Sequence, residues 1–431
     1  MVVASSTAIA LAVASLTESG VDAGEAFGPE HLNFNATVGA RFLPWLMQAL
    51  FGQDGAIVVS VVQAVMMGLT VLAIALMAQV INRDWFWPSA VLGALWPNMV
   101  WRVGMVSSSE PSFLVFLAWA LCACVWAMKS EHPARLLVRA GLAFGVAFLI
   151  RSVLLLLPFF IIPALAYALK SKRRNWVQAV GLAILPIVVM WIVGSVEFVR
   201  NRIEYGHFAY APQGGFVMAL WTYPCLSQRF GCGDRDQELV AEVNRLAGER
   251  VSQLPQEDRE DRFEISRVYG RLGTELIMAL PIDRLVVSAL GGFAKLMGHT
   301  VWLDVMRSED VEPVYFSRTP GEGVERLSNF LGAVVASPWM AVWLIFQLGL
   351  LASRGLQVFG LIGGISDPAT RRKMIFLVAA AVSMILPAVG AGTIRYRVPI
   401  EPILVVLTVA GWTALVRLAA ASATRRTKAA R

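Results

Sequence analysis

The chain has 431 residues, of which 57% are hydrophobic and only 16% are charged. This composition excludes a soluble globular protein and indicates a chain whose main solvent is lipid. The net charge of +7 does not indicate nucleic-acid binding, because Lys and Arg lie in short clusters between apolar runs rather than on one polar domain.

Ten apolar runs reach or approach the roughly 20 residues with which a helix crosses about 30 Å of hydrocarbon. The run 2–16 is short and lacks the basic start of a signal peptide, so we interpret it as a membrane helix, either trimmed or with a mis-assigned start. We therefore predict an all-α polytopic membrane protein with roughly ten transmembrane helices. The runs are 2–16, 56–81, 89–105, 111–128, 140–150, 153–169, 176–199, 330–351, 374–389 and 399–416.

The basic residues of the short loops predict the orientation, because cytoplasmic loops carry an excess of Lys and Arg. With ten helices, most of these residues fall on one face, which is then cytoplasmic. They are Lys129, Arg135, Arg139, Lys170, Lys172, Arg173, Arg174, Arg354, Arg371, Arg372, Lys373, Arg417, Arg425, Arg426, Lys428 and Arg431.

This orientation divides the chain into three regions. Residues 1–199 form an N-terminal transmembrane region with an acidic first outward loop at 17–50, residues 200–329 form a large outward loop of mainly helical character, and residues 330–431 form a C-terminal transmembrane region with a basic tail. The amphipathic piece 284–302 is predicted to lie in the membrane interface, because a further span there would reverse the sidedness of everything that follows.

The first outward loop gathers four acidic residues, namely Glu18, Asp22, Glu25 and Glu30. A carboxylate held beside the bilayer can act as general base toward a hydroxyl, or it can help to bind a divalent cation. A solvated acidic loop is the alternative. The sequence supplies no unambiguous set of metal ligands, so no cofactor is certain and a divalent cation stays an open option.

Further charged residues lie where membrane helices begin or end. Glu110 opens the fourth apolar run and is either a carboxylate that stabilises the helix dipole or part of a site. Arg151, Arg395 and Arg397 lie at membrane depth, where an ionisable residue is costly and therefore indicates function. Guanidinium binds phosphate bidentately and keeps its charge, so these arginines suit a lipid-linked phosphate, with interfacial anchoring as the alternative.

Cys225 and Cys232 lie in the outward loop with six residues between them. On an oxidising side of the membrane they can form a disulfide, and two free thiols are the alternative. Cys122 and Cys124 lie within a predicted membrane helix.

The sequence shows no nucleotide-binding loop, dinucleotide fingerprint, zinc-hydrolase helix or nucleophile elbow. Several motifs occur in order instead: Asp22; Pro44; Leu50-Phe51-Gly52; Gln63; Ala94-Leu95-Trp96-Pro97; Ser109-Glu110-Pro111; Gly141 to Arg151; Phe198-Val199-Arg200-Asn201 with Gly206; Gly214-Gly215; and Arg395 to Pro402. Together they resemble the GT-C superfamily of polyprenyl-phosphate-sugar-dependent glycosyltransferases, in the branch of the protein O-mannosyltransferases and the lipid A aminoarabinose transferase.

The resemblance implies an inverting transfer of a sugar from a polyprenyl-phosphate donor to an acceptor hydroxyl or phosphate, on the periplasmic face of a bacterial inner membrane. Envelope glycan, lipid or protein would be the acceptor, and membrane lipids would be further partners. Asp22 matches the first-loop acid of the family and would be the general base or a carboxylate that orients the acceptor. Because Ala23 follows it, the usual Asp-Glu pair is missing, so Glu25 and Glu110 are the other candidates.

The same resemblance assigns the donor phosphate to arginines. Arg395 and Arg397 match the basic motif before the last span and would stabilise the leaving phosphate, which needs charge stabilisation rather than strong protonation. Arg151 is a further phosphate ligand by its position, and Arg200 is either such a ligand or a structural residue at the start of the outward loop.

A multi-span transporter or flippase of a lipid-linked or envelope substrate is the competing class. Transporters tend to show internal repeats and broken helices near the midplane, and the sequence shows neither, so the enzyme is the preferred interpretation. A membrane scaffold without enzymatic activity is disfavoured by the number of outward charged clusters.

Overall fold

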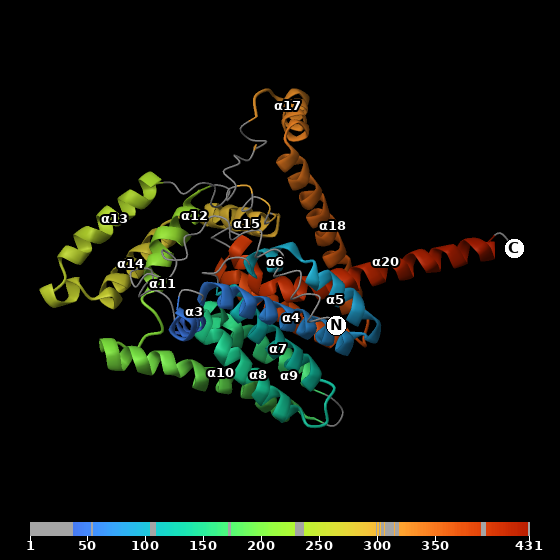
Figure 1. Cartoon of the computed structure of the whole chain (residues 1–431), viewed down its shortest axis with the longest axis horizontal. Helices are drawn as coiled ribbons and strands as arrows, with labels where there is room; N and C mark the ends of the chain where they lie inside the picture. The colour runs from blue at the N-terminus through green and yellow to red at the C-terminus, as the bar shows by residue number, and fades with distance from the viewer. Residues whose placement is uncertain are drawn as a thin grey trace.

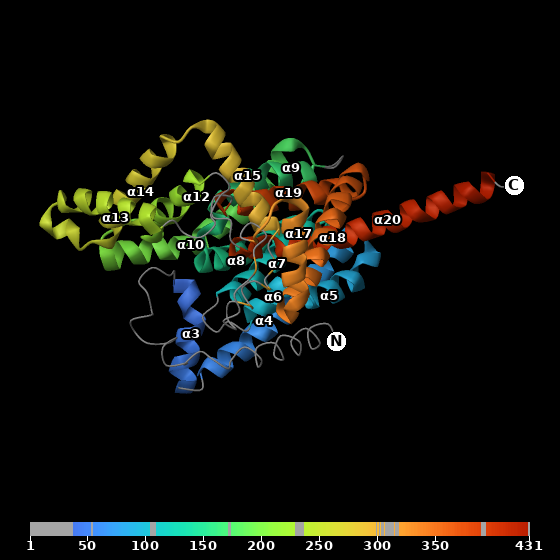
Figure 2. The ribbon, with the colours of Figure 1, turned by 90° about the horizontal axis from the view of Figure 1, so that it is seen from above.

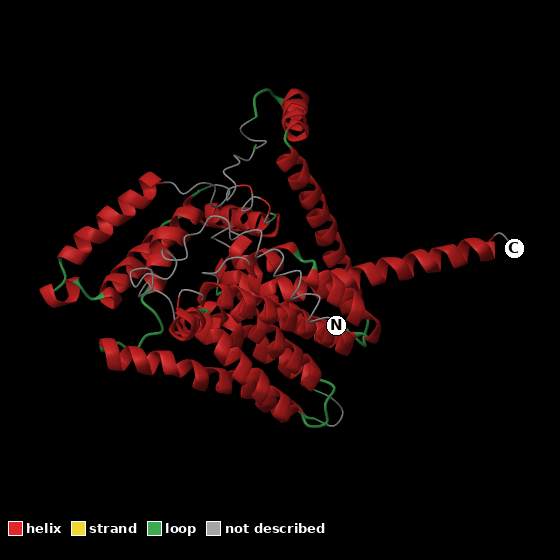
Figure 3. Cartoon of the chain, in the orientation of Figure 1, coloured by secondary structure: helices red, strands yellow, loops and turns green. Residues whose placement is uncertain are grey.

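The computed structural model describes residues 38–52, 55–103, 109–170, 174–228, 237–298, 300, 302, 306, 314, 319–388 and 394–429, and these are mainly helical (Figure 3). The α-helices are α3 (Val38–Phe51), α4 (Gly55–Ile81), α5 (Phe86–Ala94), α6 (Pro97–Val103), α7 (Glu110–Ala127), α8 (Pro133–Ile150), α9 (Leu157–Leu169), α10 (Trp176–Tyr205), α11 (Gln213–Val217), α12 (Tyr223–Ser227), α13 (Gln237–Ser252), α14 (Arg262–Met278), α15 (Ile282–Gly298), α17 (Gly323–Ala336), α18 (Pro338–Ser366), α19 (Arg371–Ile385) and α20 (Glu401–Ala429).

Seven helical segments of the described chain are long and apolar enough to cross a membrane, and the bent pair α14 and α15, at 110°, would make eight. An all-α polytopic membrane fold is therefore confirmed. The predicted run 2–16 lies outside the described residues. The seven segments are Ile57–Ile81, Glu110–Ala127, Pro133–Ile150, Ser152–Leu169, Trp176–Tyr205, Pro338–Ser366 and Tyr396–Thr424.

Several predicted spans have different boundaries in the structure. The run 89–105 is divided between α5 and α6, because Pro97 lacks an N–H group and disfavours helical backbone in the residue before it. The sequence also placed Arg354 in a loop on the cytoplasmic face. The structure corrects this, since α18 runs without interruption from Pro338 to Ser366 and includes Arg354.

Glycines allow the closest helix contacts in the bundle. A Cβ atom at Gly145 of α8 would lie 2.5 Å from Cβ of Val193 of α10, and one at Gly194 would lie 2.4 Å from the ring of Phe148. Small residues at such a contact let membrane helices approach closely, where packing rather than the hydrophobic effect holds them together. Because these pairs advance together along both sequences, α8 and α10 run parallel and end on the same side.

The segment between α10 and α17 forms a separate group of helices. In Figures 1 and 2, α13 and α14 lie near the C-terminal end of α10, far from the C-terminal end of α20. The helices α13 and α14 lie within the outward loop 200–329, which was predicted to be mainly helical, and the amphipathic piece 284–302 overlaps α15. We call the end of the bundle at which α10 passes into α11 the loop end.

Candidate functional site

Ion pairs that are buried among the membrane helices gather at the loop end. The carboxylate of Glu110, at the start of α7, is 1% exposed and lies 2.5 Å from Nη2 of Arg151, which follows α8. Ser109 accepts a hydrogen bond of 3.3 Å from Nε of Arg151. A charge in the membrane core persists when an opposite charge and hydrogen bonds compensate it. The structure thus brings two of the predicted site residues together.

A second carboxylate, Glu401, begins α20 and is fully buried. Its Oε1 accepts from Nε of Arg397 at 2.6 Å and from Nδ2 of Asn98 at 2.7 Å, and its Oε2 accepts from Nε1 of Trp96 at 2.5 Å. Trp96 and Asn98 lie on either side of Pro97. The break between α5 and α6 therefore supplies hydrogen-bond donors to a carboxylate that lies more than three hundred residues further along the chain.

Arg354 of α18 lies within electrostatic range of Arg397 and Glu401. Its Nε donates to the main-chain oxygen of Met297 at 3.0 Å, and Arg397 donates to that of Leu296 at 2.9 Å, so both cations meet the carbonyl end of α15. Nη2 of Arg354 is buried and has no hydrogen-bond partner among the described residues. We call Arg354, Arg397 and Glu401 the basic cluster; two of its three members are cations.

Arg200 and Asn201 fix the exit of the chain from the bundle. Nη2 of Arg200 lies 3.0 Å from the buried carboxylate of Glu197 and donates to Asn201 at 2.8 Å. Nδ2 of Asn201 donates to two successive main-chain oxygens of the returning segment, each at 2.8 Å. Between them Gly206 ends α10 with φ of 76°, a left-handed conformation that favours glycine. This geometry supports the structural alternative for Arg200.

The returning segment is also joined to α8. The hydroxyl of Tyr210 donates to the main-chain oxygen of Phe148, and the two rings stack with their centroids 4.6 Å apart. Phe148 lies three residues before Arg151. Through Tyr210 the loop region is therefore packed directly on the part of the bundle that holds the Glu110–Arg151 ion pair.

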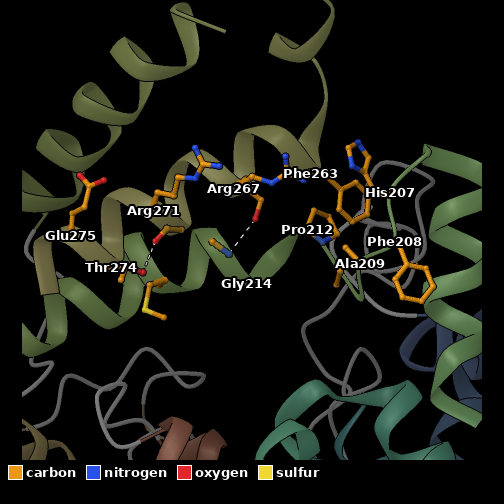
Figure 4. Close-up of a pocket in the computed structure, with 15 residues that line it drawn as sticks. His207, Phe208, Ala209, Pro212, Gly214, Phe263, Arg267, Arg271, Thr274 and Glu275 are labelled. Atoms are coloured by element: carbon orange, nitrogen blue, oxygen red, sulfur yellow. Dashed lines mark hydrogen bonds between the residues drawn. The ribbon is translucent and has the colours of Figure 1, made fainter. Parts of the chain in front are cut away.

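A cleft of about 770 Å³ lies between the returning segment, α11 and α14 (Figure 4). At its floor the N–H of Gly215 donates to Oγ of Ser266 at 3.1 Å, and a Cβ atom at Gly215 would lie only 1.7 Å from the main-chain oxygen of Ser266. The α14 wall carries Phe263, Arg267 and Arg271. A volume of this size is typical of sites for small ligands.

One end of the cleft is held by a contact between His207 and Asp261. Nε2 of His207 lies 2.6 Å from Oδ2 of Asp261, and the imidazole stacks on Phe263 with centroids 5.0 Å apart. Partial burial acts to raise the pKa of Asp261, but the hydrogen bond with His207 and those from the N–H groups at the start of α14 outweigh it and lower the pKa. Asp261 is thus both the N-cap of α14 and the partner of His207.

The predicted catalytic acids of the first loop, Asp22 and Glu25, lie outside the described residues, so their roles stay predictions. Arg395 lies in the 3-10 turn Ile394–Ile400, and its side chain is likewise outside the described part. Among the residues that the structure describes, no three His, Cys, Asp or Glu side chains gather as they would around a metal ion.

The cysteines divide into two groups. Cys225 is disulfide-bonded, whereas Cys122 and Cys124 are free thiols buried in α7. Cys232 lies outside the described residues, and its pairing with Cys225 stays a prediction.

Four residues of these clusters had no predicted role: Trp96, Asn98, Arg354 and Glu401. Glu401 follows Arg397 by four residues, a spacing that brings two side chains together on a helix, and this signal was available. Trp96 and Asn98 flank a proline inside an apolar run. The proline indicates a break in the helix, but it does not indicate that the two side chains bind Glu401. The role of Arg354 depends on the length of α18, which the composition of the run 330–351 did not reveal.

Comparison with known proteins bears on the class of this chain. Residues 36–196, a little over a third of the chain, match the family described as dolichyl-phosphate-mannose-protein mannosyltransferase. No curated protein matches the chain. Among solved structures, it is similar to the archaeal oligosaccharyltransferase AglB from Archaeoglobus fulgidus, determined in complex with an inhibitory peptide and a dolichol-phosphate, with a TM-score of 0.45 and 14% identity.

The similarity to that oligosaccharyltransferase covers 91% of this chain and 44% of the other, so the chain spans less than half the length of that protein. The family match confirms the resemblance to the GT-C superfamily. The chain is therefore a polytopic membrane protein in which residues 36–196 are similar to a glycosyltransferase family of the GT-C superfamily. These similarities do not identify the donor, the acceptor or the catalytic residues of this chain.

Proposed function

We propose that the protein transfers a sugar, with inversion, from a polyprenyl-phosphate-linked donor to an acceptor hydroxyl or phosphate. The reaction takes place at the loop end, which faces the periplasm of a bacterial inner membrane. Envelope glycan, lipid or protein is the acceptor. The family match at residues 36–196 supports the class of reaction, and the positive-inside distribution of Lys and Arg supports the orientation.

The observation that carries the proposal is Nη2 of Arg354, a buried guanidinium donor without a partner among the described residues. A buried donor without an acceptor is unfavourable, and a buried cation needs an anion. The phosphate of a lipid carrier offers both an acceptor and negative charge, and its polyprenyl chain delivers it at membrane depth. We therefore add Arg354 to Arg395, Arg397 and Arg151 as residues that contact or surround the donor phosphate.

The leaving group of this reaction is a phosphate ester, which needs little protonation because its charge can be stabilised by nearby cations. One carboxylate then suffices to take the proton of the acceptor hydroxyl as it attacks the sugar. We assign this role to Asp22, with Glu25 as the alternative. Glu110 is the weaker candidate, because its carboxylate is already engaged in the ion pair with Arg151.

The test is a comparison of envelope glycans and glycolipids by mass spectrometry between cells with the intact protein and cells carrying Asp22→Asn at equal membrane level. Loss of one sugar from one acceptor supports the transferase and identifies both substrates by mass. Unchanged glycans with Asp22→Asn, Glu25→Gln and the double variant would reject a first-loop base.

A transporter or flippase is the second candidate, favoured by the interrupted helix α5–α6, because discontinuous helices commonly line substrate sites in transporters. Movement of a lipid-linked sugar across proteoliposomes without any covalent change would identify this activity. Covalent transfer in detergent, where no second compartment exists, would exclude it as the main function.

A further inference from the structure

The cleft between α11 and α14 has the shape of an elongated groove. Its α14 wall runs from Phe263 to Glu275, and twelve residues of helix correspond to a length of about 18 Å at 1.5 Å per residue. Figure 4 shows the labelled side chains spread along this length rather than around one point. A ligand that fills the groove is therefore extended, and longer than a single sugar ring.

The groove carries a cation that is available to a ligand. Arg267 is engaged by Glu264 at 2.6 Å, and Glu275 is engaged by Arg250 of α13 at 2.7 Å. Arg271 lies between them, exposed, and makes no hydrogen bond among the described residues, although Glu275 is within electrostatic range. A guanidinium in this position favours a carboxylate, sulfate or phosphate group on the ligand.

The remaining lining suits hydroxylated rings. Phe208 is 70% exposed at one end of the groove and offers the face of its ring, whose negative quadrupole attracts polarised C–H groups. At the other end the hydroxyl of Thr274 donates to the main-chain oxygen of Gly270 at 2.8 Å, so its oxygen is left to accept from a ligand hydroxyl. An aromatic ring can pack on the apolar face of a sugar, and a threonine oxygen can accept a hydrogen bond from one of its hydroxyl groups.

We propose that this groove binds an extended anionic oligosaccharide, with its acidic group on Arg271 and a sugar ring on Phe208. Because Tyr210 and Asn201 fasten the same segment to the loop end of the bundle, one side of the groove continues to the part of the bundle that holds the Glu110–Arg151 ion pair. The oligosaccharide is then the acceptor chain. This role as acceptor rests on the proposed function, whereas binding itself does not.

The test measures binding to the full-length protein in detergent by saturation-transfer NMR, without any donor. The anionic probe is hyaluronan tetrasaccharide, and its neutral counterpart of equal length is chitotetraose. We expect the anionic probe to bind more tightly. Arg271→Gln should weaken it about tenfold and leave the neutral probe unchanged, because the loss of one charge-assisted contact affects only the acidic ligand.

A matched pair of glycine substitutions tests the location. A Cβ atom meets nothing within 4 Å at Gly214, which lines the groove, or at Gly248, which lies on α13 away from it. Gly214→Phe should abolish saturation of both probes, whereas Gly248→Phe should change neither. Unchanged binding in Gly214→Phe, or equal affinity for the two probes in the intact protein, would overturn the proposal. Arg271→Gln replaces an exposed residue, so it decides the question even if Gly214→Phe misfolds.

Two further outcomes separate this inference from the proposed function. Displacement of the tetrasaccharide by farnesyl phosphate would place the probe in the donor site and overturn the acceptor role. Binding that survives in Asp22→Asn, while transfer is lost, supports both. Absence of transfer with any donor, together with binding that responds to Arg271→Gln, would reject the transferase and keep the groove as an oligosaccharide site.

Discussion

Tyr210 touches Phe148 in two ways at once: its hydroxyl donates to the main-chain oxygen of Phe148, and its ring stacks on the ring of the same residue. Tyr210 belongs to the segment that forms one side of the groove, whereas Phe148 belongs to the last turn of α8. The side chain of Tyr210 therefore makes both a hydrogen bond and a ring contact between the loop region and the membrane bundle. A substitution can remove the hydrogen bond and keep the ring contact.

Tyr210→Phe removes the hydroxyl and keeps the ring. We expect a loss of about 1 kcal/mol of stability, the usual contribution of one hydrogen bond, together with faster amide exchange in residues 207–217. Tyr205→Phe is the control, because its ring contacts Phe263 and its hydroxyl makes no hydrogen bond to any residue that the structure describes. Equal exchange rates in the two variants would show that the Tyr210 hydroxyl does not fasten the segment.

Glu110→Gln breaks an ion pair that is almost completely buried. Because Arg151 then keeps its charge without a carboxylate at membrane depth, we expect a loss of about 3 kcal/mol or more in unfolding by SDS. Glu131→Gln, an exposed carboxylate in the connection between α7 and α8, should cost almost nothing. The double variant with Arg151→Gln should recover part of the loss, and no recovery would mean that the two residues act independently.

Arg354→Gln tests the donor site. If Nη2 of Arg354 meets the donor phosphate, the variant should raise KM for the polyprenyl-linked donor by about tenfold or more, while kcat changes less, because a ground-state contact is lost. Arg354→Lys keeps the charge and should retain part of the affinity. Arg417→Gln removes an exposed arginine sixteen residues further along α20 than Glu401 and serves as the control. An unchanged KM in Arg354→Gln would remove this residue from the donor site.

Two neighbouring glycines should respond in opposite ways to alanine. At Gly215 a Cβ atom would lie 1.7 Å from the main-chain oxygen of Ser266, so α11 must move away from α14 and we expect a loss of about 2 kcal/mol. At Gly214 a Cβ atom meets nothing, and the greater helix propensity of alanine makes the change neutral or slightly stabilising. Thermal unfolding of both variants in one detergent measures the difference.

The contact between His207 and Asp261 predicts a dependence on pH. Because the pKa of Asp261 is lower in the folded protein than in an unfolded chain, its contribution to stability is complete above the unfolded value of about 3.9. The contribution is lost as the pH falls through the lower folded value. Asp261→Asn should flatten this acid limb of the unfolding curve, whereas Asp258→Asn, three residues away, should leave its shape unchanged. An acid limb of equal steepness in Asp261→Asn would contradict the assignment.

Much of the fold was predictable from the sequence because lipid imposes a length and a composition on every span. The helices α4, α7 and α10 begin within one residue of their predicted runs, whereas α8 begins at Pro133, seven residues before the predicted run 140–150. The interruption between α5 and α6 was not predicted, although Pro97 indicated it, because the hydropathy on either side is continuous. Arg354 was placed in a loop because a basic residue that follows an apolar run usually indicates the end of a membrane helix. Its contacts with α15 and its position near Glu401, which explain how it lies within α18, are not visible in the sequence.

Several single residues of the candidate site were predicted from the sequence, but the contacts between them were not. Glu110 and Arg151 were both identified from the sequence. Their contact joins the first residue of α7 to the residue that follows α8, and no spacing within one helix predicts such a pair. Glu401 was visible within the motif before the last span and received no role, since its donors, Trp96 and Asn98, lie in a distant segment. Asp22 and Glu25, which carry the proposed chemistry, rest on the sequence and the resemblance alone.

The contact of Glu401 with Trp96 and Asn98 has a consequence for biosynthesis. Membrane chains are made and inserted from the N-terminus, so the broken helix α5–α6 enters the bilayer long before α20 exists to present its carboxylate. Until then the indole and the amide lack the acceptor that they bind in the finished protein. A nascent chain or a truncated product that ends before Glu401 therefore cannot complete the loop end. The loop end is therefore completed only when the last helix has been inserted, and its hydrogen bonds depend on the full length of the chain.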